Sequence, residues 1–245
     1  MARSRLLSAQ LSAVEQHEGA VPKKAAVHEM RVAARRLRAA LRVLRLRELD
    51  PPVKRLQDAL GRVRDLQLQV DWLRGRDDIL RRSRMASLRK AEQALERELQ
   101  KWRSEALPAL LQAAGHSTAS SRKVWKMLRK RLARLEERLE RARRRLSPQA
   151  LHRARISVKQ VRYLLDVAKE SLPKKAVSLG ADLKTLQATL GELHDVDVRI
   201  GLVKRKPALL RDQQEARKRL GRIASAQLER WLELHLVERA ESALR

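Results

Sequence analysis

Two stretches of the chain carry basic side chains at spacings suited to binding a polyanion. In the first, VHEMRVAARRLRAALRVL at residues 27–44, the cations recur at steps of three or four: His28, Arg31, Arg35, Arg38 and Arg42. Such steps place side chains on one face of an α-helix. Because each guanidinium presents several N–H donors in a fixed fork, a row of arginines suits phosphate oxygens. The row is about 21 Å long at 1.5 Å per residue, which fits a linear polyanion better than a single nucleotide.

Apolar side chains border this basic row on the helix. At about 100° per residue, the row spans about 100° of the helix surface, and the apolar face with Met30, Leu37 and Leu41 is centred about 200° from His28. Val32 and Val43 project near 50°, on the other side of the row. We therefore predict that the helix packs on two sides and that its cations line a groove or pore. A solvated outer face is the alternative, because charged rows on helices usually face water.

The second stretch, LHRARISVKQVRYLLDVA at residues 151–168, aligns on the first without gaps. His28, Arg31, Arg35 and Arg38 pair with His152, Arg155, Lys159 and Arg162. LQDALGRVRDLQL at residues 56–68 likewise aligns on LQATLGELHDVDV at 186–198, which pairs Gly61 with Gly191 and Asp65 with Asp195. Internal repetition of this kind predicts two copies of one helical unit.

Helical periodicity covers nearly the whole chain, and breakers separate the periodic segments. We expect helices over residues 3–18, 24–48, 51–74, 77–113, 120–146, 148–171, 174–205 and 207–243. Asp50 and Ser147, each followed by proline, are expected to be helix N-caps. The first repeat then covers about residues 1–114, a linker about 115–120 and the second repeat about 121–245. Lys126 and Lys130 on the helix after the linker are candidates for further groove cations.

At VHEMRVAARRLRAAL and LHRARISVKQVRYLL, each followed by an LG motif and an aspartate, the sequence resembles the conserved-histidine α-helical domain, or CHAD, family. The resemblance covers essentially the whole chain. It implies one all-α domain over residues 1–245, with two four-helix repeats related by pseudo-twofold symmetry around a basic groove or pore. It also implies binding of inorganic polyphosphate and targeting to polyphosphate granules. The residues that fit the family's motifs are His28, Arg31, Arg35, Arg36, Arg38, His152, Arg155, Lys159 and Arg162; Gln160 departs from the basic residue often found there.

Composition supports a polyanion partner for the whole chain. Lys and Arg number 57 against 29 acidic residues, and the excess appears in both halves, 25 to 14 up to residue 120 and 32 to 15 beyond it. A formal charge of +28 attracts nucleic acid, anionic membranes or phosphate polymers. Cysteine is absent, and there is no apolar run of transmembrane length. We expect a cytoplasmic protein without a membrane partner.

Two other functions compete with polyphosphate binding. The same cations would grip a nucleic acid backbone, although one Tyr, four Trp and no Phe offer few stacking platforms. A phosphohydrolase or histidine phosphotransfer enzyme would need paired carboxylates or an activated nucleophile, which the basic helices lack. We therefore expect weak, non-specific nucleic acid binding at most, no catalytic residue, no bound metal and no cofactor.

Overall fold

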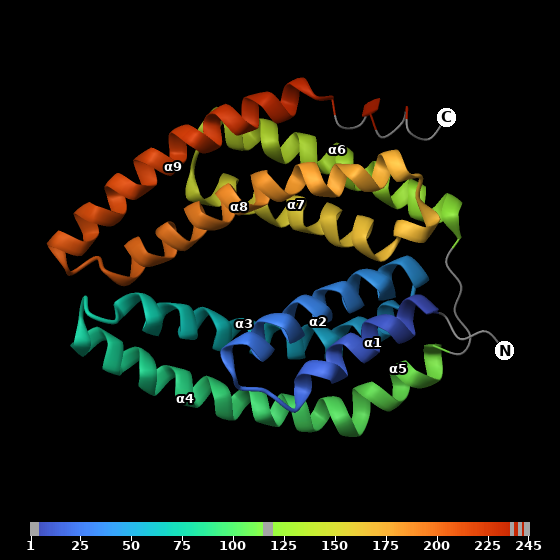
Figure 1. Ribbon diagram of the computed structural model, residues 1–245, viewed down its shortest axis with the longest axis horizontal. Coiled ribbons are helices and arrows are strands. Elements are labelled where there is room, and N and C mark those ends of the chain that lie inside the picture. Colours follow the sequence, from blue (N-terminus) through green and yellow to red (C-terminus); the bar gives the residue numbers. More distant parts are fainter. Residues whose placement is uncertain (1–4, 115–119, 236–237, 240–241, 243–245) are drawn as a thin grey trace. The chain divides into compact units, whose positions relative to one another are not determined.

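The computed structural model describes residues 5–114, 120–235, 238–239 and 242. Every regular element in these residues is helical, and none of them forms a strand, so the all-α prediction is confirmed. Two compact units divide the chain, residues 1–119 and 120–245. Figure 1 shows the helices of both units in chain order. The expected linker at residues 115–119 lies outside the described part of the chain.

The first unit is a bundle of antiparallel helices. Its elements are α1 (Arg5–Glu18), α2 (Lys24–Leu44), α3 (Asp50–Leu73), α4 (Asp78–Lys101), a π turn (Trp102–Ala106) and α5 (Leu107–Ala114). Each helix packs on the next, and α5, which continues α4 beyond the π turn, packs back on α1. Leucines with Trp102 fill the interior. This packing fixes α2 and α3 as neighbours, which brings their polar faces together.

The second unit repeats the arrangement with α6 (Ser121–Arg145), α7 (Pro148–Val167), α8 (Lys174–Leu202) and α9 (Pro207–Glu233). Consecutive helices pack on one another, and α6 packs on α9 to close the bundle. Its core is also aliphatic, with Leu128, Leu135, Leu164, Leu183 and Leu190 at most 1% exposed. The pseudo-twofold relation of the repeats stays a prediction.

Helix ends show where local geometry overrides periodicity. Ser147 is the expected N-cap, because its hydroxyl accepts from the amide of Ala150 and Pro148 opens α7. The same expectation is wrong for Asp50, which is the first residue of α3 and makes no cap hydrogen bond. The helix predicted over 24–48 ends at Leu44, because Arg45 adopts a left-handed conformation with φ 64°. The helix predicted to reach residue 243 is interrupted after Glu233, since His235 is also left-handed with φ 45°, and residues 238–239 and 242 are again helical.

Candidate anion-binding site

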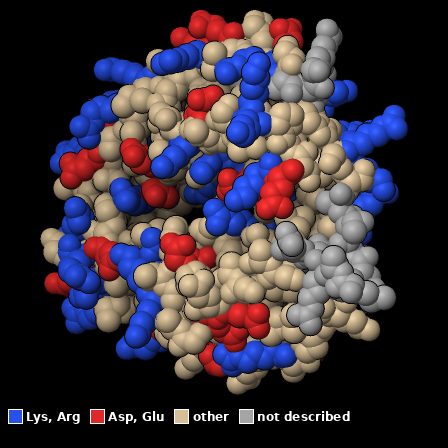
Figure 2. Space-filling view, turned by 45° about the vertical axis from the view of Figure 1, so that its right-hand side comes forward, with Lys and Arg blue, Asp and Glu red and all other residues tan. Residues whose placement is uncertain are grey.

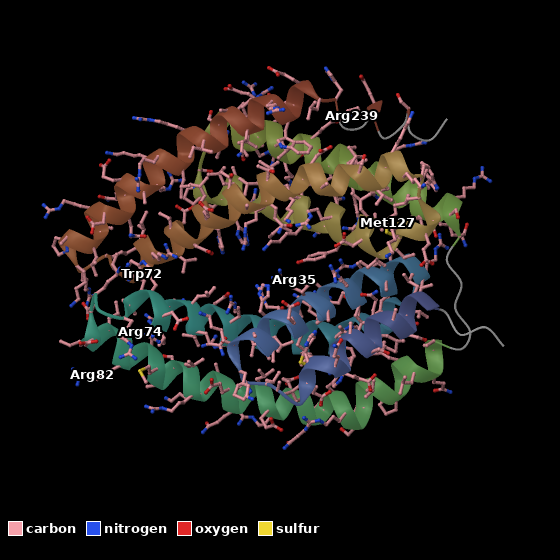
Figure 3. All side chains as sticks on the ribbon, viewed as in Figure 1. Arg35, Trp72, Arg74, Arg82, Met127 and Arg239 are labelled. Carbon is pink, nitrogen blue, oxygen red and sulfur yellow. The ribbon has the colours of Figure 1, made fainter. Side chains whose placement is uncertain are left out.

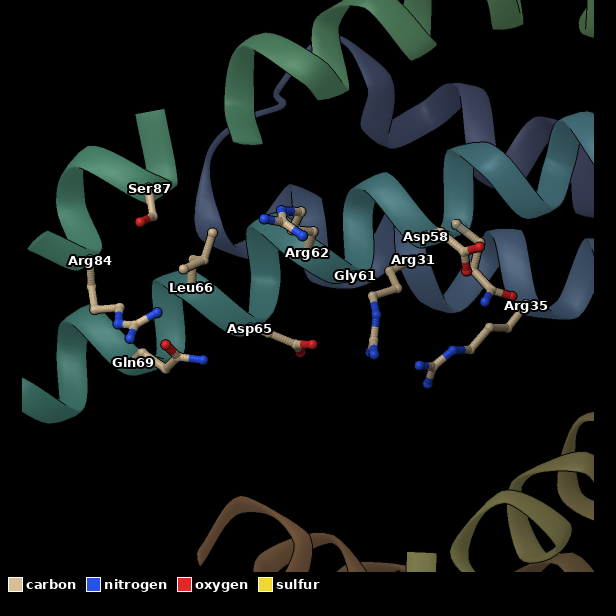
Figure 4. Close-up of a pocket in the computed structure, with 11 residues that line it drawn as sticks. Arg31, Arg35, Asp58, Gly61, Arg62, Asp65, Leu66, Gln69, Arg84 and Ser87 are labelled. Carbon is tan, nitrogen blue, oxygen red and sulfur yellow. The ribbon is translucent and has the colours of Figure 1, made fainter. Parts of the chain in front are cut away.

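An open pocket of about 550 Å³ in the first unit gathers arginines from three helices. Figure 4 shows it along α3, with Arg31 and Arg35 of α2 towards one end and Arg84 of α4 at the other. The lining residues are Arg31, Arg35, Gln57, Asp58, Gly61, Arg62, Asp65, Leu66, Gln69, Arg84 and Ser87. Four guanidinium groups around one hollow, opposed by two carboxylates, make this a place where an anion is favoured.

Arg31 and Arg35 are the two sequence-predicted residues that line the pocket. Arg31 lies over Gly61, and a Cβ added there would stand 3.4 Å from its Nε atom. This glycine thus leaves room for a close approach of the α2 arginine to α3. Arg35 is half-buried and stands out from α2 in Figure 3. Arg36, by contrast, is exposed and does not line the pocket.

Sequence reasoning missed Arg62 and Arg84, which enlarge the basic lining of the pocket. Arg62 belongs to α3 and Arg84 to α4, neither of which carries a repeated basic row. The Nε atom of Arg84 and the Oε1 atom of Gln69 are buried without a hydrogen-bond partner. Only the packing of α3 on α4 brings these groups together, so no spacing in the sequence marks them.

Arg38 and Arg42 are committed to a carboxylate of their own unit. Arg38 donates from Nε to Asp50 Oδ1 at 2.7 Å and from Nη2 to Oδ2 at 2.8 Å, while Arg42 Nη2 lies 3.9 Å from Oδ2. Burial raises the pKa of Asp50, but the hydrogen bond and charge of Arg38 outweigh it, so the pKa lies below the ordinary 3.8. Burial and the charge of Arg38 lower the pKa of Arg42. This cluster fixes the α2–α3 corner.

The histidines of the two motifs each face a basic or imidazole group from the neighbouring helix. Burial, followed by the charge of Arg64 on α3, lowers the pKa of His28 from 6.5. His152 lies with its Nδ1 3.3 Å from Nδ1 of His194 on α8, and burial with the charges of Arg155 and Lys159 lowers its pKa. Both histidines therefore favour the neutral form when no anion is bound.

The second unit reproduces one detailed contact of the first. Arg38 Nη1 donates to Gln57 Oε1 at 3.2 Å, and Arg162 Nη1 donates to Gln187 Oε1 at 2.9 Å. These four residues correspond under the same two alignments that pair the basic motifs. In both units, a glutamine of the next helix orients the same motif arginine.

Two further predictions concern the second unit: the apolar border of its basic row and the cations of α6. Ile156 and Val167 of the second motif correspond to Val32 and Val43 of the first. Val167 is buried, whereas Ile156 is 40% exposed, so the predicted apolar packing on this side of the basic row is incomplete. Lys126 and Lys130 are exposed on α6, and neither makes a hydrogen bond or ion pair within the described residues. Arg131 of α6 reaches α7, where its Nη1 donates to the side-chain and backbone oxygens of Gln160, each at 3.4 Å.

Within the described residues, no group of three or more His, Asp or Glu side chains is placed to hold a metal ion. None of the described helices is both long and apolar enough to cross a membrane.

Comparison with known proteins connects these bundles to one family. The family model of the CHAD domain matches residues 5–204, which contain both basic helices and the glutamines that orient their arginines. The chain belongs to the CHAD domain family. A structure described as the crystal structure of the CHAD domain from the plant Ricinus communis matches with a TM-score of 0.60 at 22% identity, covering 91% of this chain and 89% of that chain. No curated protein matches the chain.

The likeness to the Ricinus communis structure shows that this chain has the CHAD fold. The CHAD family match ends at residue 204, so α9 lies beyond it, although α9 completes the second bundle by packing on α6 and α8. Both repeats of the basic motif therefore fall within the CHAD match, together with the pocket of the first unit.

Proposed function

We propose that this CHAD domain binds inorganic polyphosphate without catalysing its turnover and that binding targets the protein to polyphosphate granules. The observation that carries the proposal is the pocket of the first unit, where Arg31, Arg35, Arg62 and Arg84 surround one hollow. Arginine forks hold phosphate oxygens at fixed geometry, and a linear polymer can satisfy several in succession. The predicted counterparts in the second unit are Arg155, Lys159 and Arg162.

A test of the proposal compares motif cations with cations outside the pocket. We expect Arg35→Glu and Lys159→Glu each to weaken binding of labelled polyphosphate by about tenfold or more, because a carboxylate both removes a charged hydrogen bond and repels the polymer. Titration at about 0.15 M salt suits this test, since charges more than about 8 Å apart are then screened. If both repeats serve one polymer, the double variant weakens binding further.

Matched controls separate a shaped site from a diffuse positive field. Arg97 on α4 and Arg211 on α9 are exposed, so Arg97→Glu and Arg211→Glu make the same charge change elsewhere. Arg239 is less suitable because it lies 3.9 Å from Asp182. Equal losses for all four variants would contradict a specific site. Stronger binding of RNA or DNA in competition would favour the nucleic acid alternative, and phosphate release from polyphosphate with Mg²⁺ would favour the hydrolase.

A further inference from the structure

We propose that the two copies of the basic motif are unequal: Arg162 binds phosphate through the guanidinium edge that Arg38 uses to hold Asp50. The inference rests on the proposed function for the identity of the polymer. It adds that, in the part of the chain that the structure describes, the arginine of one repeat has no carboxylate partner at this position, whereas the arginine of the other repeat is already paired with a carboxylate.

In the first unit, the guanidinium of Arg38 is fully engaged. Its Nε and Nη2 donate to the two oxygens of Asp50 at 2.7 and 2.8 Å, and its Nη1 donates to Gln57 at 3.2 Å. The Arg38 side chain is only 13% exposed. A phosphate would have to displace a bidentate carboxylate to reach this arginine, so Arg38 has a structural role.

In the second unit, the corresponding guanidinium lacks that carboxylate. Arg162 Nη1 donates to Gln187 at 2.9 Å, as in the first unit, but its Nε is buried without a hydrogen-bond partner. Among the residues that the structure describes, no carboxylate pairs with Arg162. A buried N–H without an acceptor is unfavourable until an acceptor is supplied.

One residue in the sequence accounts for the difference. Asp50 precedes Gln57 by seven residues, and Gly180 precedes Gln187 by the same seven. The helix therefore presents a carboxylate at this position in α3 and no side chain in α8. A Cβ at Gly180 would lie 3.7 Å from Cδ1 of Leu165, an ordinary contact, so α8 has room for a Cβ there.

A phosphate group can supply the acceptor that the Nε–H of Arg162 lacks. Two phosphate oxygens can accept from Nε and Nη2 of one guanidinium, just as the two Asp50 oxygens do on Arg38. Both motif arginines are held in place by glutamine, so the second is oriented before any anion arrives. The carboxylate of the first unit thus marks where a phosphate sits in the second.

The sharpest experiment places the missing carboxylate in the second unit. Gly180→Asp is compared with Gly180→Asn, which has nearly the same size but no charge. We expect Gly180→Asp to bind labelled polyphosphate about tenfold more weakly than Gly180→Asn, the worth of one charged hydrogen-bonding site. Equal affinities of the two variants, with both folded by circular dichroism, would overturn the inference.

A second pair of variants keeps the inference testable if Gly180→Asp does not fold. We expect Arg38→Gln to lower the melting temperature more than Arg162→Gln does, and Arg162→Gln to lower polyphosphate affinity more than Arg38→Gln does. The opposite order in both measurements would overturn the assignment.

Failure of the inference can be told from failure of the proposed function by using inorganic phosphate as the probe. In the wild-type protein, the arginine Nε–H signals are followed by NMR during titration with inorganic phosphate. A shift of the Arg162 signal that exceeds the shift of Arg38 supports the anion site even if the wild-type protein binds no polyphosphate. Equal or absent shifts would count against the site even if the polymer binds.

Discussion

At the scale of single residues, His28 and His152 are expected to make anion binding depend on pH. Their pKa values lie below 6.5 because of burial and nearby cations. The unfolded chain therefore binds more protons below pH 6.5, so the contribution of these groups to stability is lost as pH falls below that value. A bound polyanion stabilises the imidazolium form and raises the pKa values of both histidines. The protein therefore takes up protons when the polyanion binds.

Polyphosphate affinity is therefore expected to rise several-fold as the pH falls from about 8 to about 5.5, where histidine titrates. His28→Gln combined with His152→Gln should flatten this dependence, as measured by titration at both pH values. His17→Gln on α1 is the matched control and should keep it. An unchanged pH dependence in the double variant would show that other groups respond.

The pairing of Asp50 with Arg38 makes the stability of the folded protein depend on pH in the acid range. Because its pKa is lowered in the folded protein, its contribution to stability is present above pH 3.8 and lost as the pH falls through the lower folded value. Asp50→Asn should therefore have a lower melting temperature than wild type at neutral pH. In strong acid, this difference in melting temperature should become smaller. A difference that stays constant with pH would contradict an ionic role for the Arg38–Asp50 pair.

At the scale of helices, the two equivalent glycines have different surroundings. Gly61 lies beneath Arg31, whereas a Cβ at Gly191 would meet nothing within 4 Å. Gly191→Ala should therefore stabilise the second unit by roughly 0.5–1 kcal/mol, the usual preference of a helix for alanine. Gly61→Ala gains the same backbone preference but crowds Arg31, so it should lower polyphosphate affinity. Denaturant unfolding and polyphosphate titration of both variants measure these effects.

The helices themselves were largely predictable because aliphatic periodicity and prolines set them. Their exact ends were not, since Arg45 and His235 adopt left-handed conformations without being glycine. The basic row on α2 was also predictable, yet its members divide into Arg31 and Arg35, which line the pocket, and Arg38, which pairs with Asp50. This division depends on what α3 presents to α2, and a spacing within one helix carries no such information.

At the scale of the whole molecule, the net charge of +28 acts on any polyanion. Figure 2 shows Lys and Arg spread widely over one face with Asp and Glu among them. If about eight phosphates are neutralised, the logarithm of the binding constant should fall against the logarithm of salt concentration with a slope of roughly −5 to −6, by analogy with single-stranded nucleic acid. Titrations over a series of salt concentrations give this slope, and a flat response would exclude multivalent phosphate contact.

The π turn at Trp102–Ala106, which joins α4 to α5, determines where these two helices tolerate the deletion of a residue. An uninterrupted α-helix would rotate Ala114 about 100° around the axis relative to Leu95, yet both residues are buried in the same core. A π turn takes more residues per revolution and so takes up the excess. Deleting exposed Ser104 would therefore leave a regular helix with Leu110 and Ala114 still facing inward. Deleting Lys90, equally exposed, would instead turn the preceding part of α4 about 100° away from α3.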